Sequence, residues 1–384
     1  NNINATISDS ANGEDNAHNT EGHSNETTVV VEGILPRIWD PYPAHQQLCF
    51  DPGKMQRYSK GGSFPLLSRA FDRSYMTDHG IVFLKPMKVG GSSASGVNLR
   101  LAKNMAERLG RPYRFCENNF DHAEGWMMTK RRRSETFMWT LLREPTKRAV
   151  SGFYHFDVSR FGREPSVENF IETMERQTNY YMQLHSFRKI HKGGVWEDDD
   201  KMLRTANAAI KNFDFMAITE RFDESMVVLQ LLLKHHNVTL GDMLFVTAKS
   251  NGGYDDGGYN NKCTFIQPSN LTQGMKDYLA SDEWKERVKW DRALYEAANR
   301  SLDMTIEKLG RSLVKRQVEL YQWAQGRVKE RCIARAKLPC TPNGVKRRPH
   351  ETNCLFQDSG CANDCIDEVV AEELATNSAS QLEI

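Results

Sequence analysis

The sequence lacks long hydrophobic runs and an excess of charge of either sign, and each absence excludes a class of protein. No apolar run approaches the roughly 18 residues that span a bilayer, because the longest candidate, Met226 to Leu233, is interrupted by Gln230. Lys and Arg total 51 while Asp and Glu total 50, which gives a net charge of +1. A bulk nucleic-acid binder would need a basic surplus. The 384 residues therefore indicate a globular protein with one large domain or two ordinary ones.

The sequence also lacks the string Gly-x-x-x-x-Gly-Lys-Ser/Thr, which disfavours an ordinary P-loop ATPase or kinase. It has a different glycine-rich segment instead. An apolar run at 80–84 predicts a strand, which leads into the segment 85–93 (KPMKVGGSS) and a helix over 95–109. Free N–H groups and the positive dipole end of that helix suit a bound anion. A plain strand-to-helix turn is the alternative interpretation.

A second segment of the same kind follows about 50 residues later. A strand is predicted at 137–142, followed by Arg143, Glu144 and Pro145 and a helix through Tyr154. Pro145 suits the first turn of that helix. Arg143 offers a bidentate fork at the strand end, and Ser151 offers a hydroxyl two turns further on, so the pair is suited to a second phosphate. The alternative is a surface helix with ordinary charge pairs.

Further strands are predicted at 215–219 and 243–247, with an amphipathic helix between them that Asp223 caps and that ends at His236. Long polar helices are predicted over 275–337. Short strands that alternate with helices are typical of an α/β fold with a parallel, doubly wound sheet.

The composition changes along the chain and predicts its organisation. Residues 1–33 contain seven Asn, six acidic residues and no Lys or Arg, so we expect a disordered stalk. The main domain is expected over 34–320, with an irregular lead-in. A helical, Cys-rich extension over 321–368 and an acidic tail over 369–384 complete the chain, since eight acidic residues and no Lys or Arg follow Arg348.

The cysteines and the glycosylation patterns point to one compartment. Five of the eight cysteines lie between Cys332 and Cys365, without the paired Cys-x-x-Cys spacing of zinc sites. We therefore expect disulfides rather than zinc, and no other metal-ligand cluster is evident. Five Asn-x-Ser/Thr patterns are present, at Asn4, Asn25, Asn237, Asn270 and Asn299. Together these features favour an oxidising, glycosylating compartment.

As a pair, the two segments resemble the phosphate-binding loops of the sulfotransferase superfamily. The resemblance implies that the first loop holds the 5′-phosphosulfate of 3′-phosphoadenosine 5′-phosphosulfate (PAPS) and the second its 3′-phosphate. The residues implied are Lys85, Lys88, Val89, Gly90, Gly91, Ser92 and Ser93 in the first loop and Arg143, Arg148 and Ser151 in the second. The fold implied is a P-loop-like three-layer sandwich, with a central parallel sheet flanked by helices, plus the Cys-rich C-terminal extension.

More narrowly, residues 80–312 resemble the Golgi carbohydrate sulfotransferases, particularly the galactose 3-O-sulfotransferase type and its algal relatives. Supporting similarity lies at 179–182 (NYYM) and 220–229 (ERFDESMVVL). The chain departs from the family pattern where Val89 replaces Thr, Gly91 replaces Ser or Thr, and Pro86-Met87 replaces Thr-His. Hydroxyl contacts are then expected from Ser92 and Ser93.

The resemblance also implies catalytic roles. Lys88 is expected to stabilise the charge that grows on the leaving phosphate. Lys85 either assists or only neutralises the charge of the cofactor. His122, in the segment between the loops, has a suitable pKa for taking the proton of the acceptor hydroxyl. Glu124 and Asp121 are the alternative bases, and an ordinary surface-loop histidine is the alternative for His122. This chemistry requires no metal.

We therefore expect a PAPS-dependent sulfotransferase with a carbohydrate acceptor and no nucleic-acid partner, which leaves adenosine 3′,5′-bisphosphate (PAP) as product. A protein-tyrosine sulfotransferase and a non-catalytic glycan-binding relative are the alternatives. The expected location is the Golgi lumen. Because the chain begins with Asn and has no signal-like segment, we expect a trimmed type II membrane protein whose anchor lies outside it.

Overall fold

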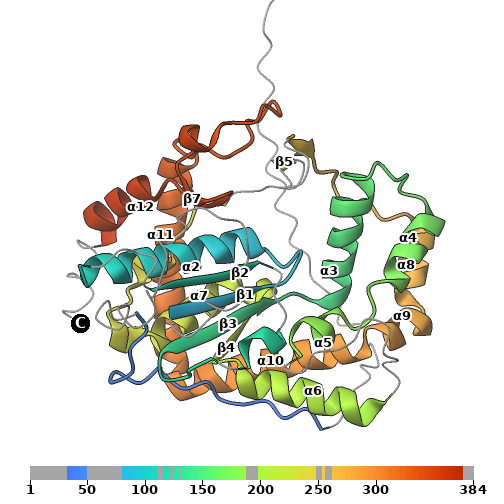
Figure 1. The fold of residues 1–384 in the computed structure, drawn as a ribbon, viewed down its shortest axis with the longest axis horizontal. Helices are drawn as coiled ribbons and strands as arrows, with labels where there is room; N and C mark the ends of the chain where they lie inside the picture. The colour runs from blue at the N-terminus through green and yellow to red at the C-terminus, as the bar shows by residue number, and fades with distance from the viewer. Residues whose placement is uncertain are drawn as a thin grey trace, which may run out of the picture. The chain divides into compact units, whose positions relative to one another are not determined.

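A parallel β-sheet organises the part of the chain that the computed structural model describes (Figure 1). The described residues are 33–49, 80–110, 116–121, 125–129, 131–186, 198–247, 253–255 and 262–374. They all belong to one compact unit, which spans Val31–Ile384. The expected stalk at 1–33 and the end of the acidic tail lie almost wholly outside the described residues.

The sheet contains four strands in the order β2-β1-β3-β4, and every neighbouring pair is parallel. The strands are β1 (Gly80–Lys85), β2 (Glu117–Asp121), β3 (Thr136–Leu142) and β4 (Phe215–Ile218). Every residue of β3 and β4 is buried. Strands covered on both faces need no alternation of polar and apolar residues, and both strands are mainly apolar, with only Thr136 and Thr140 polar in β3. The predicted α/β class and the predicted strands at 80–84, 137–142 and 215–219 are confirmed.

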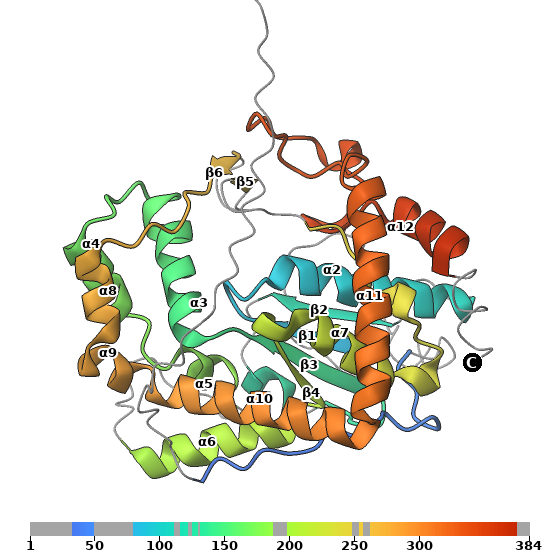
Figure 2. The same ribbon diagram turned by 180° about the vertical axis from the view of Figure 1, so that it is seen from behind.

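Helices flank this sheet. The longer helices around the sheet, together with the one that follows β3, are α2 (Gly91–Arg108), α3 (Pro145–Gly152), α7 (Phe222–Leu232), α10 (Lys289–Leu309) and α11 (Arg311–Cys332). Helix α2 packs on β1 and β2, whereas α7 and α10 pack on β4. In Figure 2 α11 lies in front of α7, against which it packs. None of the helices in the described ranges is both long and apolar enough to cross a bilayer.

The other regular elements are shorter. The remaining α-helices are α4 (Val167–Glu175), α5 (Tyr180–Leu184), α6 (Asp199–Asn212), α8 (Gln273–Ala280), α9 (Asp282–Arg287) and α12 (Asn363–Val369). Two antiparallel ladders pair β5 (Tyr254–Asp255) with β6 (Thr264–Phe265) and β7 (Cys354–Phe356) with β8 (Ser359–Cys361). Single turns of 3₁₀-helix lie at Gly125–Met128, Thr219–Arg221, Lys234–His236, Leu240–Met243 and Pro349–Glu351, and π-helical turns lie at Phe153–Val158 and Val370–Leu374.

A buried polar residue fixes α2 against the sheet. The Asn98 side chain donates to the carbonyl of Ile81 in β1 and accepts from the indole N–H of Trp139 in β3. Trp139 also packs against Phe83, with ring centroids 4.3 Å apart. Because an unpaired amide would be costly in this core, these bonds favour a single position of α2 over the two strands.

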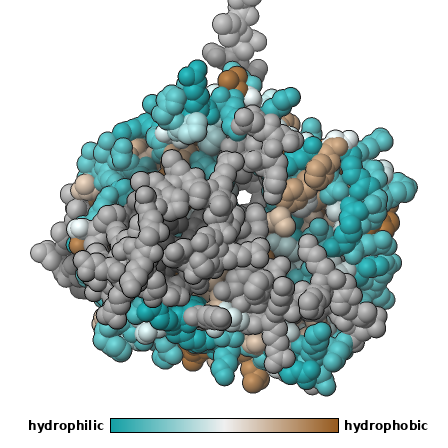
Figure 3. Space-filling view, viewed as in Figure 1, coloured by the Kyte–Doolittle hydropathy of each residue, from teal (hydrophilic) through white to brown (hydrophobic). Residues whose placement is uncertain are grey.

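Hydrophilic side chains cover most of the described surface on the face in Figure 3, and the hydrophobic ones form small separate groups.

Three local predictions are wrong. The helix predicted to end at His236 ends at Leu232, and Lys234–His236 form a separate 3₁₀ turn. Residues 243–247 form no strand, because Leu240–Met243 is a 3₁₀ turn and the backbone of Phe245 pairs with a side chain instead of a strand. The Gln325 amide donates to the Phe245 carbonyl at 2.7 Å and accepts from its N–H at 3.3 Å. Asp223 is not an N-cap either, since α7 begins one residue earlier and places Asp223 in its first turn. A carboxylate there still interacts favourably with the helix dipole.

All eight cysteines form disulfides, which confirms the prediction of disulfide bonds. Cys332–Cys365 links α11 to α12, and Cys354–Cys361 joins β7 to β8. The other two bonds are Cys49–Cys116 and Cys263–Cys340. The last of these ties the extension to residues far outside it.

The lengths of the closed loops predict a ranking of stability losses. Cys332–Cys365 closes a separation of 33 residues and Cys354–Cys361 one of 7. Because a longer loop restrains the unfolded chain more, the double Cys→Ala variant of the first bond should lose about 4 kcal/mol and that of the second about 2 kcal/mol. Guanidinium chloride unfolding of the oxidised proteins measures both. The reverse order of losses would contradict this account.

Candidate functional site

The first glycine-rich loop makes a tight turn between β1 and α2. Its end has two residues with left-handed backbone, Lys88 at φ 64° and Gly90 at φ 81°. Glycine adopts this conformation without cost, whereas for lysine it is uncommon and typical of functional turns. The N–H groups of Ser93 and Ala94 bond to the Gly90 carbonyl. The N–H groups of the residues before them have no partner within the helix, so they are available to an anion.

Gly91 has a steric role that accounts for the absence of a larger residue at this position. A Cβ atom at this position would lie 2.8 Å from Cγ of Lys85, which is closer than real Cβ contacts come. The aliphatic part of Lys85 therefore packs directly on the first turn of α2. A Ser or Thr at position 91 would displace Lys85 from this position. The sequence showed the missing hydroxyl but not this reason for it.

The second loop lies beside the first. β1 and β3 are parallel neighbours, with Leu84 opposite Thr140, so both loops start at the same edge of the sheet. Nη1 of Arg143 donates to the Lys88 carbonyl at 3.2 Å. Glu144 caps α3 by accepting from two backbone N–H groups of its first turn, and Pro145 is the first residue of the helix, as predicted. Ser151 lies half-buried in the same helix.

Two consecutive tyrosines hold the two loops, one each. The Tyr180 hydroxyl accepts from the Met87 N–H at 2.7 Å. The Tyr181 hydroxyl accepts from the Arg143 N–H at 2.9 Å and donates to the Arg143 carbonyl at 2.8 Å. Burial raises the pKa of both phenols, so both keep their protons. These positions belong to the NYYM segment, which sequence comparison singled out without giving it a role.

A buried aspartate orients the tyrosine pair. Oδ1 of Asp291, in α10, accepts from the N–H groups of Tyr181 and Met182 at 2.9 and 3.1 Å. Burial raises the pKa of Asp291 to about 6, against the opposing influence of the Arg148 guanidinium. Cζ of Arg148 lies 4.0 Å from the centroid of the Tyr180 ring, and the residue is 3% exposed. The structure therefore packs Arg148 on Tyr180, which holds the first loop. The contact of Arg148 with a cofactor stays a prediction.

Other contacts complete the first loop. The Thr219 hydroxyl, directly after β4, donates to the carbonyl of the buried Val89 at 2.8 Å. The Ser92 hydroxyl donates to Asp358 at 3.1 Å. Neither Thr219 nor Asp358 was predicted from the sequence, because nothing in the sequence places them near the loop.

The predicted base cannot be located from the described residues. His122 and Glu124 lie outside them. Asp121, the other alternative, ends β2 and is the register partner of Lys85 in β1. In the described part of the chain, no group of three or more His, Cys, Asp or Glu residues could hold a metal ion.

No protein-family model matches the sequence, and no curated protein matches it significantly.

The buried aspartate gives a pH prediction. An ordinary aspartate titrates near pH 4, so between about pH 4 and pH 6 the native protein keeps a proton on Asp291 that the unfolded chain has lost. The free energy of unfolding should therefore fall as the pH rises through this range. Asp291→Asn keeps the Oδ1 acceptor and cannot ionise. This part of the fall in the free energy of unfolding between pH 4 and pH 6, on the order of 1–3 kcal/mol in total, should therefore disappear.

Urea unfolding at several pH values measures the effect. Asp200→Asn, at an exposed aspartate of α6, is the control and should keep the wild-type slope. An Asp291→Asn slope equal to that of the wild type would contradict the assignment.

Proposed function

We propose that the protein is a sulfotransferase that moves a sulfuryl group from PAPS to a carbohydrate hydroxyl. The observation that carries the proposal is the hydrogen bond from Arg143 to the Lys88 carbonyl, which joins two phosphate-type loops at one edge of a parallel sheet. Ligands of α/β proteins bind at the carboxyl ends of the strands. A nucleotide with phosphates at both its 5′ and 3′ positions needs two neighbouring anion sites.

The donors fit that nucleotide. Backbone N–H groups and the dipole of α2, with Lys85 and Lys88 close by, suit the 5′-phosphosulfate. Arg143 uses one of its five N–H donors on the Lys88 carbonyl, which leaves donors for a bidentate contact with the 3′-phosphate. Ser151 adds a hydroxyl from α3. We accordingly propose a P-loop-like fold in which the tyrosine pair keeps both loops in register.

The proposed chemistry has two parts, one at the leaving phosphate and one at the acceptor hydroxyl. Bound PAPS supplies the sulfuryl group. The ammonium of Lys88 stabilises the negative charge on the departing 5′-phosphate, and His122 takes the proton of the acceptor hydroxyl. Asp121 and Glu124 are the alternative bases.

The disulfides support a lumenal location. Four bonds in one chain are typical of proteins made in an oxidising compartment. We propose the Golgi lumen, where a carbohydrate acceptor and PAPS would meet. Transfer of labelled sulfate to a panel of glycans, with a tyrosine peptide in parallel, tests the acceptor class. Transfer to the peptide alone would favour the tyrosine sulfotransferase alternative.

The nucleotide assignment predicts the effect of a single substitution. Arg143→Ala should weaken the binding of PAP by about 2 kcal/mol, which is roughly 30-fold, because a charge-assisted bidentate contact is lost. Arg143→Lys should recover only part of this affinity, since lysine keeps the charge but not the fork. Calorimetry measures the affinities, with Arg316→Ala on the exposed face of α11 as the control. Unchanged binding by Arg143→Ala would remove the assignment.

The catalytic roles predict that two variants differ in binding as well as in turnover. His122→Ala should lower kcat by roughly 10²–10⁴-fold, the usual contribution of a positioned base, with little change in PAP affinity. Lys88→Ala should lower both turnover and affinity, because its charge acts in the bound state and in the transition state. Near-normal turnover of His122→Ala would transfer the role to Asp121 or Glu124, to be tested in the same assay.

A further inference from the structure

The Cys-rich extension reaches the first phosphate loop. The turn between β7 and β8 carries Asp358, and Oδ2 of Asp358 accepts the hydroxyl proton of Ser92 in the first turn of α2 at 3.1 Å. The two residues are 266 positions apart in the sequence. The turn itself is tight, since Gln357 has a left-handed backbone with φ 48°. A carboxylate from the extension therefore lies where the proposed nucleotide would place its 5′-phosphosulfate.

The hairpin is fixed against α2 by close backbone packing. Cys354–Cys361 joins the outer ends of its two strands. A Cβ atom on Gly96, in α2, would lie 2.8 Å from the backbone nitrogen of Gly360, so any side chain at position 96 would push the hairpin away. Ser359, next to Asp358, is buried. The position of Asp358 thus follows from the packing of the hairpin and not from one surface contact.

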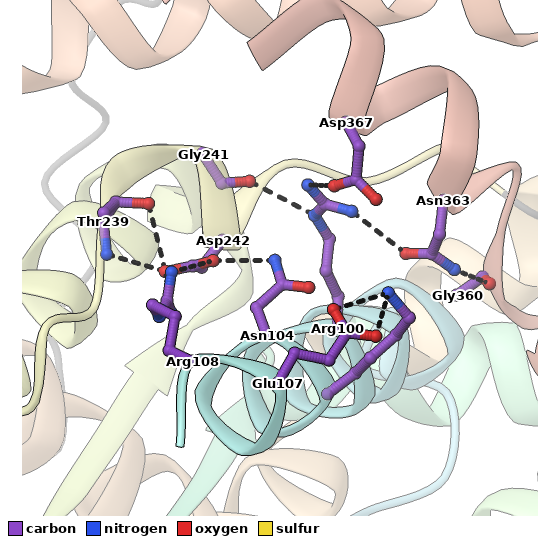
Figure 4. A network of polar contacts seen from close by, with 11 residues as sticks. Arg100, Asn104, Glu107, Arg108, Thr239, Gly241, Asp242, Gly360, Asn363 and Asp367 are labelled. Atoms are coloured by element: carbon purple, nitrogen blue, oxygen red, sulfur yellow. Dashed lines mark hydrogen bonds and ion pairs between the residues drawn. The ribbon is translucent and has the colours of Figure 1, made fainter. Parts of the chain in front are cut away.

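A buried arginine fixes the rest of the extension to the same helix (Figure 4). Arg100, in α2, is 2% exposed. Its guanidinium donates to the Asn363 side chain at 3.3 Å, to Asp367 at 2.6 Å and to the Gly241 carbonyl at 3.2 Å. Losing one partner of such a buried group costs far more than losing an exposed ion pair. Together with the hairpin packing, this network fixes the extension along α2 as far as the loop.

Physical chemistry makes Asp358 a competitor of the bound anion. A serine hydroxyl has one proton, so Ser92 cannot donate it to Asp358 and to a phosphate oxygen together. The helix dipole that favours a phosphate at the start of α2 also favours a carboxylate there. A carboxylate and a phosphate that share one hydroxyl donor would also repel each other.

We infer that Asp358 is a positioning residue that holds the Ser92 hydroxyl and competes with the 5′-phosphate group for it, so that the extension sets nucleotide affinity. This inference rests on the proposed function. On binding of the nucleotide, the Ser92 O–H turns from Asp358 to the phosphate, and no covalent bond changes. A purely structural role of Asp358 would lower affinity when the residue is replaced, whereas competition predicts the opposite.

The test is calorimetric binding of PAP to Asp358→Asn, which keeps the shape of the side chain and removes its charge. Affinity should rise about tenfold, and the gain should shrink at high salt because screening weakens the repulsion that is removed. Asp364→Asn, at an exposed aspartate of α12, is the matched control and should bind as the wild type does. In a Ser92→Ala background the gain from Asp358→Asn should be smaller, because no hydroxyl is left to compete for.

A second variant tests the same point without changing either partner. Gly96→Ala should displace the hairpin from α2 and also raise the affinity for PAP. If the wild type binds PAP and Asp358→Asn binds it equally or more weakly, the inference is overturned and the proposed function stands. If neither the wild type nor any of these folded variants binds PAP, both are overturned. Binding by Asp358→Asn alone would support both.

Discussion

Parallel pairing of β1 with β3 is the constraint on which the candidate site depends. Two parallel strands end at the same edge of a sheet, so the loop after Lys85 and the loop after Leu142 must start side by side. In an antiparallel pair the same two sequences would lie at opposite edges. The bond from Arg143 to the Lys88 carbonyl is a local consequence of that topology.

The strands bring the loops together but do not fix their conformations. The tyrosine pair at 180–181 fixes their conformations. The Tyr180 hydroxyl bonds to the backbone of the first loop, and the Tyr181 hydroxyl bonds to the backbone of the second. Asp291 in turn fixes the tyrosines, and it does so from α10, more than 100 residues away. A buried carboxylate with a raised pKa is a costly way to hold a five-residue helix. In the proposed function this cost keeps the two loops rigid before the nucleotide binds.

The extension contacts the first loop of the candidate site through Asp358 and Ser92. Disulfides give it rigidity that a short hairpin would lack in water, and Arg100 and Gly96 fix where it lies on α2. The same helix thus presents its N-terminus to the proposed nucleotide and the side that carries Gly96 and Arg100 to the extension. A displacement of the extension would change the hydrogen bond between Asp358 and Ser92.

The sequence alone determined the strands β1, β3 and β4, the glycine-rich turn and the helix start at Pro145, because these depend on apolar runs, Gly and Pro within a few residues. It also determined that the cysteines form disulfides. Tertiary structure decided what depends on distant partners. Tyr180 and Asp358 gained their roles from contacts 93 and 266 positions away.

Local propensity also failed where a distant group replaced the expected partner. Residues 243–247 have the composition of a strand, yet Gln325 of α11 takes the backbone bonds that a neighbouring strand would have made at Phe245. In the same way β2, with its polar sequence ENNFD, becomes a strand only because β1 offers it an edge. Short-range patterns determine which segments can form strands, and the pairing that satisfies their backbone groups is decided only when the whole chain folds.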